Sequence, residues 1–288
     1  MGKKVSLVLS SGGARGIAHI GIIEELEKRG YEICSISGTS MGSLIGGIYA
    51  SGNFEIFKKW LYSLTTVEIL KLFDFTLSKN GLVKGDKIFK EFRKFIPDKN
   101  IEELPIPFVA VSTDIINNKE VVFESGSLFQ AIRASISIPT FFKPLISGNT
   151  VLVDGGLLNP TPVNRVKRFD DDLLFVVNVE AQKNKTSSEY KSLEKEEQQT
   201  TKLNQILPIK QSDQLGYLQI LNKTIGIMLN QISELTIEKY NPDMLITIDR
   251  ERFGTYDFHR YSEIVEAGRE IAKIKLDEFE AQSKGKLL

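Results

Sequence analysis

The feature that most constrains the fold is a series of short, continuous apolar runs separated by segments with helical spacing. The runs lie at residues 5–9, 33–36, 107–111 and 173–179. Strands buried on both faces carry such continuous runs, whereas strands with one solvated face alternate between apolar and polar residues. Between the first two runs, residues 17–29 show helical spacing of apolar side chains. Strand followed by helix and strand predicts an α/β fold around a parallel sheet.

The length of 288 residues allows one large α/β domain or two small ones. We predict a single domain over residues 1–288. The sequence becomes polar and charged around residues 183–205, which predicts a solvated insertion. Residues 206–288 are predicted to complete the domain with an amphipathic helix at residues 218–235, a strand at 244–248 and a helix at 261–279. For the apolar stripe of the first helix, core packing is the simpler interpretation, and a lid or a membrane contact is the alternative.

Composition excludes several classes of protein. The 37 basic and 37 acidic residues give a formal net charge of zero, so no overall field favours nucleic acid or an anionic membrane. The only cysteine is Cys34, which rules out a disulfide framework and a cysteine cluster for zinc. The first apolar run is too short for a signal peptide, and no apolar run reaches the length of about 18 residues that a membrane helix requires. We therefore expect a soluble, cytoplasmic protein.

Ser40 is the centre of a G-x-S-x-G sequence whose glycines are Gly38 and Gly42. The motif lies between the apolar run at residues 33–36 and a segment predicted to be helical as far as Ala50. Glycines at these positions allow a tight turn from strand to helix that exposes the serine hydroxyl at the helix N-terminus. The motif in this context predicts a nucleophilic serine.

A loop of small residues follows the first predicted strand. It consists of Ser11, Gly12, Gly13, Ala14, Arg15 and Gly16. Ser11 occupies the place of the first glycine of a dinucleotide fingerprint, and the chain lacks a Gly-Lys-Ser/Thr phosphate loop. Beside a nucleophilic serine, the exposed N–H groups of such a loop favour an oxyanion hole. Arg15 is expected either to orient the loop or to bind a phosphate, and a surface ion pair is the alternative.

Asp154 follows a short apolar run at residues 151–153 and precedes Gly155 and Gly156. A carboxylate at a strand end can act as the general base that takes the proton of Ser40, if the two groups lie within hydrogen-bond reach. A simple turn is the alternative interpretation. The block at residues 134–144 reads as a helix end before a proline, and no function follows from it alone.

In combination, these motifs resemble the patatin-like phospholipase family, and within it the bacterial branch of short single-domain proteins. The resemblance covers about residues 5–180, with the glycine loop, the G-x-S-x-G motif, the block at residues 134–144 and the Asp-Gly-Gly sequence in the family's order. It implies a three-layer α/β fold, with a mostly parallel central sheet and helices on both faces. It also implies a dyad of Ser40 and Asp154 without histidine, and hydrolysis of fatty-acyl esters from phospholipids, lysophospholipids or acylglycerols.

The expected partners are an acyl lipid as substrate and, transiently, a membrane surface. Residues 54–77 are rich in aromatic and aliphatic side chains. We expect most of them in the core, and the alternative is that some line an acyl-chain pocket. Hydrolysis through an acyl-enzyme requires no metal and no organic cofactor.

Three alternatives remain open from the sequence. An α/β-hydrolase-type esterase would use Ser40, Asp154 and His259 as a triad, which is the chain order of that fold. His259, however, lies in a charged late segment where exposure is expected, and His19 is expected to be structural. The second alternative is a weakly catalytic protein that binds acyl lipid. The third is an acyltransferase, which would pass the acyl group to an alcohol.

Overall fold

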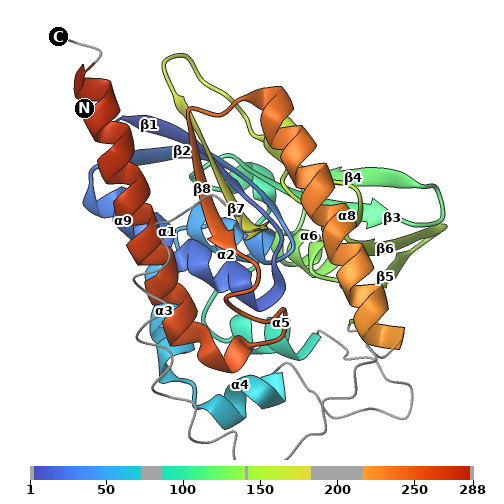
Figure 1. Cartoon of the computed structure of the whole chain (residues 1–288). Helices are drawn as coiled ribbons and strands as arrows, with labels where there is room; N and C mark the ends of the chain where they lie inside the picture. Colours follow the sequence, from blue (N-terminus) through green and yellow to red (C-terminus); the bar gives the residue numbers. More distant parts are fainter. Residues whose placement is uncertain (1–2, 73–85, 140–141, 183–216, 286–288) are drawn as a thin grey trace, which may run out of the picture.

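The computed structural model describes residues 3–72, 86–139, 142–182 and 217–285. The strands of this part form one eight-stranded sheet in the order β5-β6-β3-β2-β1-β7-β8, with β4 paired to β3 (Figure 1). The strands are β1 (Lys4–Leu9), β2 (Glu32–Thr39), β3 (Phe108–Asp114), β4 (Lys119–Phe123), β5 (Leu145–Ser147), β6 (Thr150–Asp154), β7 (Leu173–Ala181) and β8 (Met244–Asp249).

The sheet has a parallel part and an antiparallel edge. β3, β2, β1, β7 and β8 run parallel to one another, and four of these five are the strands predicted from continuous apolar runs. The strand predicted at residues 244–248 is confirmed as β8. On the other side, β4 and β6 pair antiparallel with β3, and β5 pairs antiparallel with β6. The mostly parallel sheet is therefore confirmed.

Helices cover both faces of the sheet. The α-helices are α1 (Ala18–Lys28), α2 (Met41–Ala50), α3 (Phe54–Ser63), α4 (Thr66–Leu72), α5 (Asp86–Phe92), α6 (Leu128–Ser135), α8 (Tyr217–Tyr240) and α9 (Tyr261–Gly285). The short 3-10 helices are η1 (Gly13–Ile17), η2 (Ile101–Glu103), η3 (Gly155–Leu157), η4 (Val163–Arg165) and η6 (Phe258–Arg260). Helices α1, α2 and α9 pack on one face, and α8 with η4 packs on the other (Figure 1). The predicted three-layer arrangement is confirmed.

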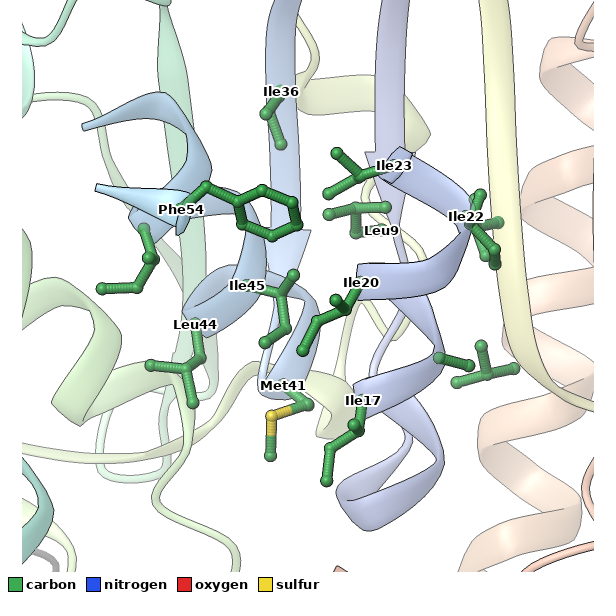
Figure 2. Packing of buried hydrophobic residues seen from close by; sticks show 14 of the residues in the cluster. Leu9, Ile17, Ile20, Ile22, Ile23, Ile36, Met41, Leu44, Ile45 and Phe54 are labelled. Carbon is green, nitrogen blue, oxygen red and sulfur yellow. The ribbon is translucent and has the colours of Figure 1, made fainter. Parts of the chain in front are cut away.

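The larger core lies between the sheet and helices α1 and α2. Leu9 of β1 and Ile36 of β2 meet Ile20 of α1 and Ile45 of α2, and all four are buried (Figure 2). Burying one such side chain stabilises the fold by about 2 kcal/mol. Val8 points the other way, into a second cluster with residues of β7, η4 and α8. Both faces of β1 are thus covered, which is why its apolar residues form a continuous run.

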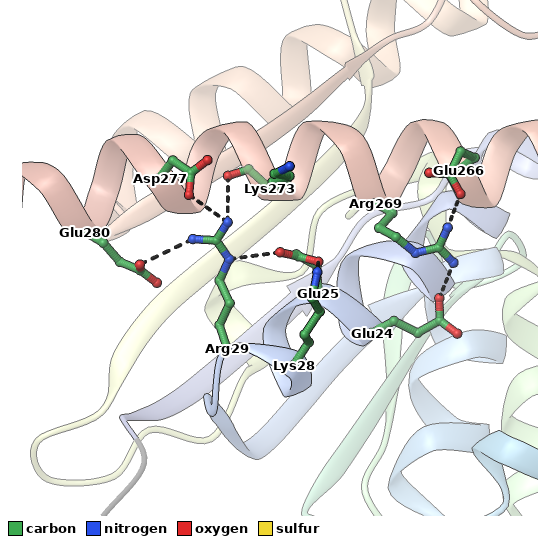
Figure 3. Close-up of polar contacts among 9 residues, drawn as sticks. All are labelled: Glu24, Glu25, Lys28, Arg29, Glu266, Arg269, Lys273, Asp277 and Glu280. Atoms are coloured by element: carbon green, nitrogen blue, oxygen red, sulfur yellow. Dashed lines mark hydrogen bonds and ion pairs between the residues drawn. The ribbon is translucent and has the colours of Figure 1, made fainter.

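Ion pairs join α1 to the C-terminal helix α9. Arg29, just after α1, lies 2.9 Å from Glu25 and 2.7 Å from Asp277 of α9 (Figure 3). Arg269 of α9 lies 2.6 Å from Glu24 of α1. Helix α1 continues from η1, and α9 continues from η6, so these contacts fix two segments that flank the glycine loop.

Helix α8 confirms the amphipathic helix predicted at residues 218–235, but core packing does not account for its whole apolar stripe. Ile225, Met228 and Leu235 are 38%, 56% and 57% exposed. The polar insertion predicted at residues 183–205 lies outside the described residues, as do residues 73–77 of the aromatic segment. Within the described ranges, no helix has the length and apolar character needed to cross a membrane.

Candidate active site

Ser40 lies in a strained turn between β2 and α2. Its backbone has φ 55° and ψ −122°, a conformation that residues with a side chain rarely adopt. The turn is tight because α2 begins directly against β1: a Cβ on Gly42 would lie 2.2 Å from the carbonyl oxygen of Leu9. Gly38 also packs closely on the backbone of Gly42, where a Cβ would lie 2.5 Å from the Gly42 carbonyl. The glycines of the motif therefore let the helix start close to the sheet and hold the serine in place.

Asp154 lies at the end of β6, within hydrogen-bond reach of Ser40. The Ser40 hydroxyl donates to Oδ2 of Asp154 at 2.5 Å, and the Gly156 amide donates to Oδ1 at 2.8 Å. Gly155 packs against the carbonyl of Val111 in β3. The two residues that the sequence proposed as nucleophile and base are thus brought together, and the aspartate is held by a second donor.

The environment of Asp154 makes its carboxyl group a weak acid. Burial, and to a smaller extent the negative charge of Glu180, raises the pKa of Asp154, and the hydrogen bonds from Ser40 and Gly156 lower it; the net result is a pKa of about 7. A general base works best when its pKa lies near the working pH. The site therefore holds a base suited to neutral conditions.

The block at residues 134–144 positions both groups. Ser135 Oγ accepts the backbone N–H of Ser40 at 2.8 Å and donates to the carbonyl of Val111 at 2.6 Å. The carbonyl of Ser137 accepts the backbone N–H of Asp154 at 2.9 Å. Sequence reasoning read this block as a helix end and as one motif of the family resemblance, and it missed the positioning role because hydrogen bonds to residues far away in the chain leave no local pattern.

The glycine loop presents two free amides beside Ser40. Among the described residues, no acceptor bonds to the N–H groups of Gly12 and Gly13, and both residues line the cavity that contains Ser40. The Ala14 amide instead donates to the carbonyl of Thr255 at 2.9 Å. Gly16 packs against Met41 of α2, and neither it nor Ala14 lines that cavity.

Arg15 holds the glycine loop through buried polar contacts. It is buried and forms an ion pair of 2.8 Å with Glu180, whose side chain is buried as well. Its Nη1 also donates to the carbonyl of Phe253 at 3.0 Å. The pairing therefore favours the loop-orienting role over a surface ion pair. The sequence offered no sign of Glu180 or of the segment around Phe253 and Thr255, which lie far from Arg15 in the chain.

Ser40 and Asp154 open into a cavity of about 240 Å³. Gly12 and Gly13 form one side of it, and apolar side chains form much of the rest, namely Ile138, Pro139, Leu157, Leu221, Ile225 and Leu229. A second cavity of about 40 Å³ lies next to α2 and is lined by apolar and aromatic side chains that include Met41, Trp60 and Phe92. Part of the aromatic segment that begins at residue 54 thus lines a cavity close to the nucleophile.

Neither histidine reaches Ser40 or Asp154. His259 lies in η6 with an exposed side chain and does not line the cavity. His19 is buried in α1, where its Nε2 lies 3.0 Å from the carbonyl of Ser10. Burial lowers the pKa of His19 to about 4, so this ring is neutral near pH 7. Both positions agree with the expectations from the sequence.

Comparison with known proteins identifies the family. The sequence model of the patatin-like phospholipase family matches residues 7–166. An uncharacterized NTE family protein of Mycobacterium tuberculosis is 31% identical over 332 aligned residues, which cover 96% of this chain and 92% of that protein.

Two further relatives are much longer than this chain. Lysophospholipase NTE1 of Candida glabrata is 27% identical over 98% of this chain and 16% of its own length. Patatin-like phospholipase domain-containing protein 6 of Homo sapiens is 31% identical over 66% of this chain and 14% of its own length. From the family match over residues 7–166 of 288 and the similarity along most of the chain, the protein belongs to the patatin-like phospholipase family of lipid acyl hydrolases.

Proposed function

We propose that the protein hydrolyses the ester bond of an acyl lipid with Ser40 as nucleophile and Asp154 as the only side-chain base. The observation that carries the proposal is the hydrogen bond of 2.5 Å from the Ser40 hydroxyl to a buried aspartate with a pKa of about 7. A carboxylate placed there can accept the serine proton directly, so the reaction needs no histidine.

In the first half of the reaction, ionised Asp154 takes the proton of Ser40 while Oγ attacks the acyl carbonyl carbon. The negative charge that develops on the carbonyl oxygen is stabilised by the amides of Gly12 and Gly13. We leave Ala14 out of this oxyanion hole because its amide already donates to Thr255. The tetrahedral intermediate then collapses, the proton passes from Asp154 to the leaving alkoxide, and the acyl-enzyme remains.

In the second half, Asp154 deprotonates a water molecule that attacks the acyl-enzyme. The same two amides stabilise the second tetrahedral intermediate, which releases the carboxylic acid and returns the proton to Ser40. Passing the acyl group to an alcohol would follow the same steps, with the alcohol in place of water.

The proposed substrates are phospholipids, lysophospholipids or acylglycerols. Support comes from the apolar wall of the catalytic cavity, on which an acyl chain can pack. The relative from Candida glabrata is named as a lysophospholipase. At the cavity wall, Leu157 and Ile225 are 40% and 38% exposed, which supports transient contact with a membrane surface. A cytoplasmic location stays a prediction.

Turnover of a lysophospholipid and of a monoacylglycerol with the same acyl chain tests the proposal. The wild-type protein is expected to release fatty acid from at least one of them, and Ser40→Ala is expected to release none above background. His259→Gln serves as the matched control for the triad alternative, because this side chain lies away from the cavity. Loss of turnover in His259→Gln comparable to that in Ser40→Ala would contradict the dyad, and binding of lipid without turnover by the wild type would favour the lipid-binding alternative.

A further inference from the structure

Two arginines line the catalytic cavity, and their surroundings differ. Arg15 has its charge balanced by Glu180 and donates further to Phe253 and Thr255. Arg250 has no ion pair and no side-chain hydrogen bond with any described residue, and its Nη1 is a buried nitrogen without a partner. A buried N–H of a charged group without a protein acceptor is unfavourable, so a ligand that brings an acceptor to this nitrogen gains by binding there.

Arg250 is placed at the cavity by the sheet. It follows β8 directly, and its backbone N–H donates to the carbonyl of Ala181 at the end of β7 at 2.9 Å. Ser40 follows the parallel strand β2, and the glycine loop follows β1. The carboxyl ends of parallel strands share one edge of the sheet, where α/β proteins bind their ligands.

A glycine on α8 makes room for the guanidinium. A Cβ on Gly226 would lie 2.0 Å from Nη2 of Arg250, so the end of the arginine packs directly on the helix backbone. Both residues line the cavity. The position of the charge therefore depends on a residue without a side chain in the middle of a long helix, where glycine is otherwise unfavourable.

The charged residues of the cavity differ in whether they form an ion pair. The charged residues in the lining are Arg15, Glu180, Asp154 and Arg250, and the first two neutralise each other. Asp154 is engaged by Ser40 and Gly156. Arg250 is therefore, among the described lining residues, the cation that has no ion pair.

We propose that Arg250 binds the phosphate of the substrate head group, so that the enzyme prefers phosphate-bearing acyl esters to uncharged ones. A guanidinium can donate two parallel hydrogen bonds to a phosphate, which an ammonium cannot match. Arg15 is less suited to this role: Glu180 and the segment around Phe253 occupy both of its terminal nitrogens, and only its Nε lacks a partner. The inference rests on the proposed function, since it names the substrate class of the same site.

The measurement is the ratio of kcat/KM for a lysophospholipid to kcat/KM for a monoacylglycerol with the same acyl chain. Arg250→Gln is expected to lower this ratio about ten- to a hundredfold, the worth of hydrogen bonds to a charged group. Gly226→Ala is expected to lower it as well, because the added Cβ displaces the guanidinium while the charge is kept. Alanine also favours the helix, so misfolding would not explain the loss.

Arg252→Gln is the matched control. This arginine lies two residues further along but outside the catalytic cavity, where its guanidinium stacks on Phe253, and its replacement is expected to leave the ratio unchanged. Product inhibition by the free fatty acid is measured in parallel. The carboxylate of this product is a second anion, besides the phosphate of the head group, that Arg250 could bind.

An unchanged ratio in Arg250→Gln would overturn the inference while turnover by the wild type keeps the proposed function. An unchanged ratio together with weaker inhibition by fatty acid would also overturn it, and would assign Arg250 to the product carboxylate. If the wild type hydrolysed neither ester, the proposed function would fail and this inference with it.

Discussion

Among the residues that the structure describes are two buried pairs of a serine hydroxyl and an aspartate, which lie at opposite ends of the parallel strands. Ser40 donates to Asp154 at the carboxyl ends of the parallel strands. Ser6 of β1 donates to Asp172, which immediately precedes β7, at the other end. The two contacts are alike in chemistry, so the hydrogen bond between serine and aspartate does not by itself define a catalytic dyad.

The electrostatic settings of the two aspartates are opposite. Burial alone would raise the pKa of Asp172, but hydrogen bonds from Arg168, Ser6 and the Phe169 amide outweigh it and hold the pKa below its usual range. No cation of the described residues pairs with Asp154, and its pKa is raised to about 7. Asp172 is therefore a stable anion that is a poor base, whereas Asp154 can both accept and return a proton near pH 7.

The two serines differ as well. Ser6 lies inside a strand, is fully buried and accepts a further hydrogen bond from Ser35. Ser40 has a strained backbone and opens into a cavity with the free amides of Gly12 and Gly13. Access for a substrate and donors for an oxyanion thus distinguish the reactive pair from the structural one.

The largest expected effect separates the two serines. Ser40→Ala is expected to lower kcat/KM for an acyl ester by about 10⁴-fold or more, because the nucleophile is lost. Ser6→Ala is expected to leave kcat/KM within about twofold and to cost about 1 kcal/mol of stability, the worth of a hydrogen bond. Steady-state hydrolysis and thermal unfolding of both variants check this, and comparable losses of activity would remove the distinction.

The second prediction separates the two aspartates by opposite effects on stability. Asp154→Asn is expected to lower kcat about 10³-fold, because the general base is lost. It is also expected to raise the free energy of unfolding at pH 8 by about 2 kcal/mol, since the folded protein no longer has to bury an ionised carboxylate at this position. Asp172→Asn is expected to keep activity and to lower the free energy of unfolding by about 2 kcal/mol. Only a small part of this loss comes from the ion pair with Arg168, because that side chain is half-exposed.

The opposite effects on stability follow from the opposite directions of the two pKa shifts. The folded protein binds the Asp154 proton more tightly than the unfolded chain does, so this group stabilises the fold at low pH, and the stabilisation is lost between about pH 4 and pH 7. Asp172 has a lowered pKa, so its stabilisation is present above about pH 4 and is lost as the pH falls through its folded value. Chemical denaturation at pH 8 measures both, and equal signs for the two variants would contradict the assignment.

The third prediction concerns the pH profile of hydrolysis. Because Asp154 must be ionised to act as base, kcat/KM is expected to rise with pH and to reach half its maximum near pH 7. Glu180→Gln removes a negative charge that raises the pKa of Asp154, so the midpoint is expected to move to lower pH. Asp172→Asn is the control and is expected to leave the midpoint unchanged; a shift in that variant, or none in Glu180→Gln, would argue against this electrostatic account.

The smallest effect is expected from removing the hydrogen bond that supports the strained turn at Ser40. Ser135→Ala removes the acceptor of the Ser40 amide and is expected to lower kcat about tenfold, because the nucleophile is less well positioned. Ser35→Ala, which removes a serine hydroxyl next to the structural pair, is its matched control. The same loss in both variants would indicate a general effect on folding.

The sequence predicted the parts of the fold that have a local signal. The apolar runs became β1, β2, β3 and β7, and the glycine-flanked Ser40 became a turn between a strand and a helix. The antiparallel strand β4 was missed because its apolar run at residues 121–123 is short and follows two charged residues, and its side chains are exposed or half-buried. Resemblance to a family, more than spacing, placed Asp154 beside Ser40.

The supporting residues of the site could not be predicted in the same way. Arg15 meets Glu180, and Ala14 meets Thr255, across more than half of the chain. Such contacts depend on which strands become neighbours, and a polar residue at a strand end looks the same in the sequence whether it faces solvent or a buried partner. Arg250 is the clearest example, because nothing near it in the sequence indicates a cavity.

Labelling with a fluorophosphonate ester, followed by intact-mass and peptide analysis, tests the central claim most directly. The account predicts one adduct per wild-type chain, located on Ser40, the same adduct in Ser6→Ala, slower labelling in Asp154→Asn and no adduct in Ser40→Ala. An adduct on another residue, or labelling of Ser40→Ala at the wild-type rate, would contradict the assignment of Ser40 as the nucleophile.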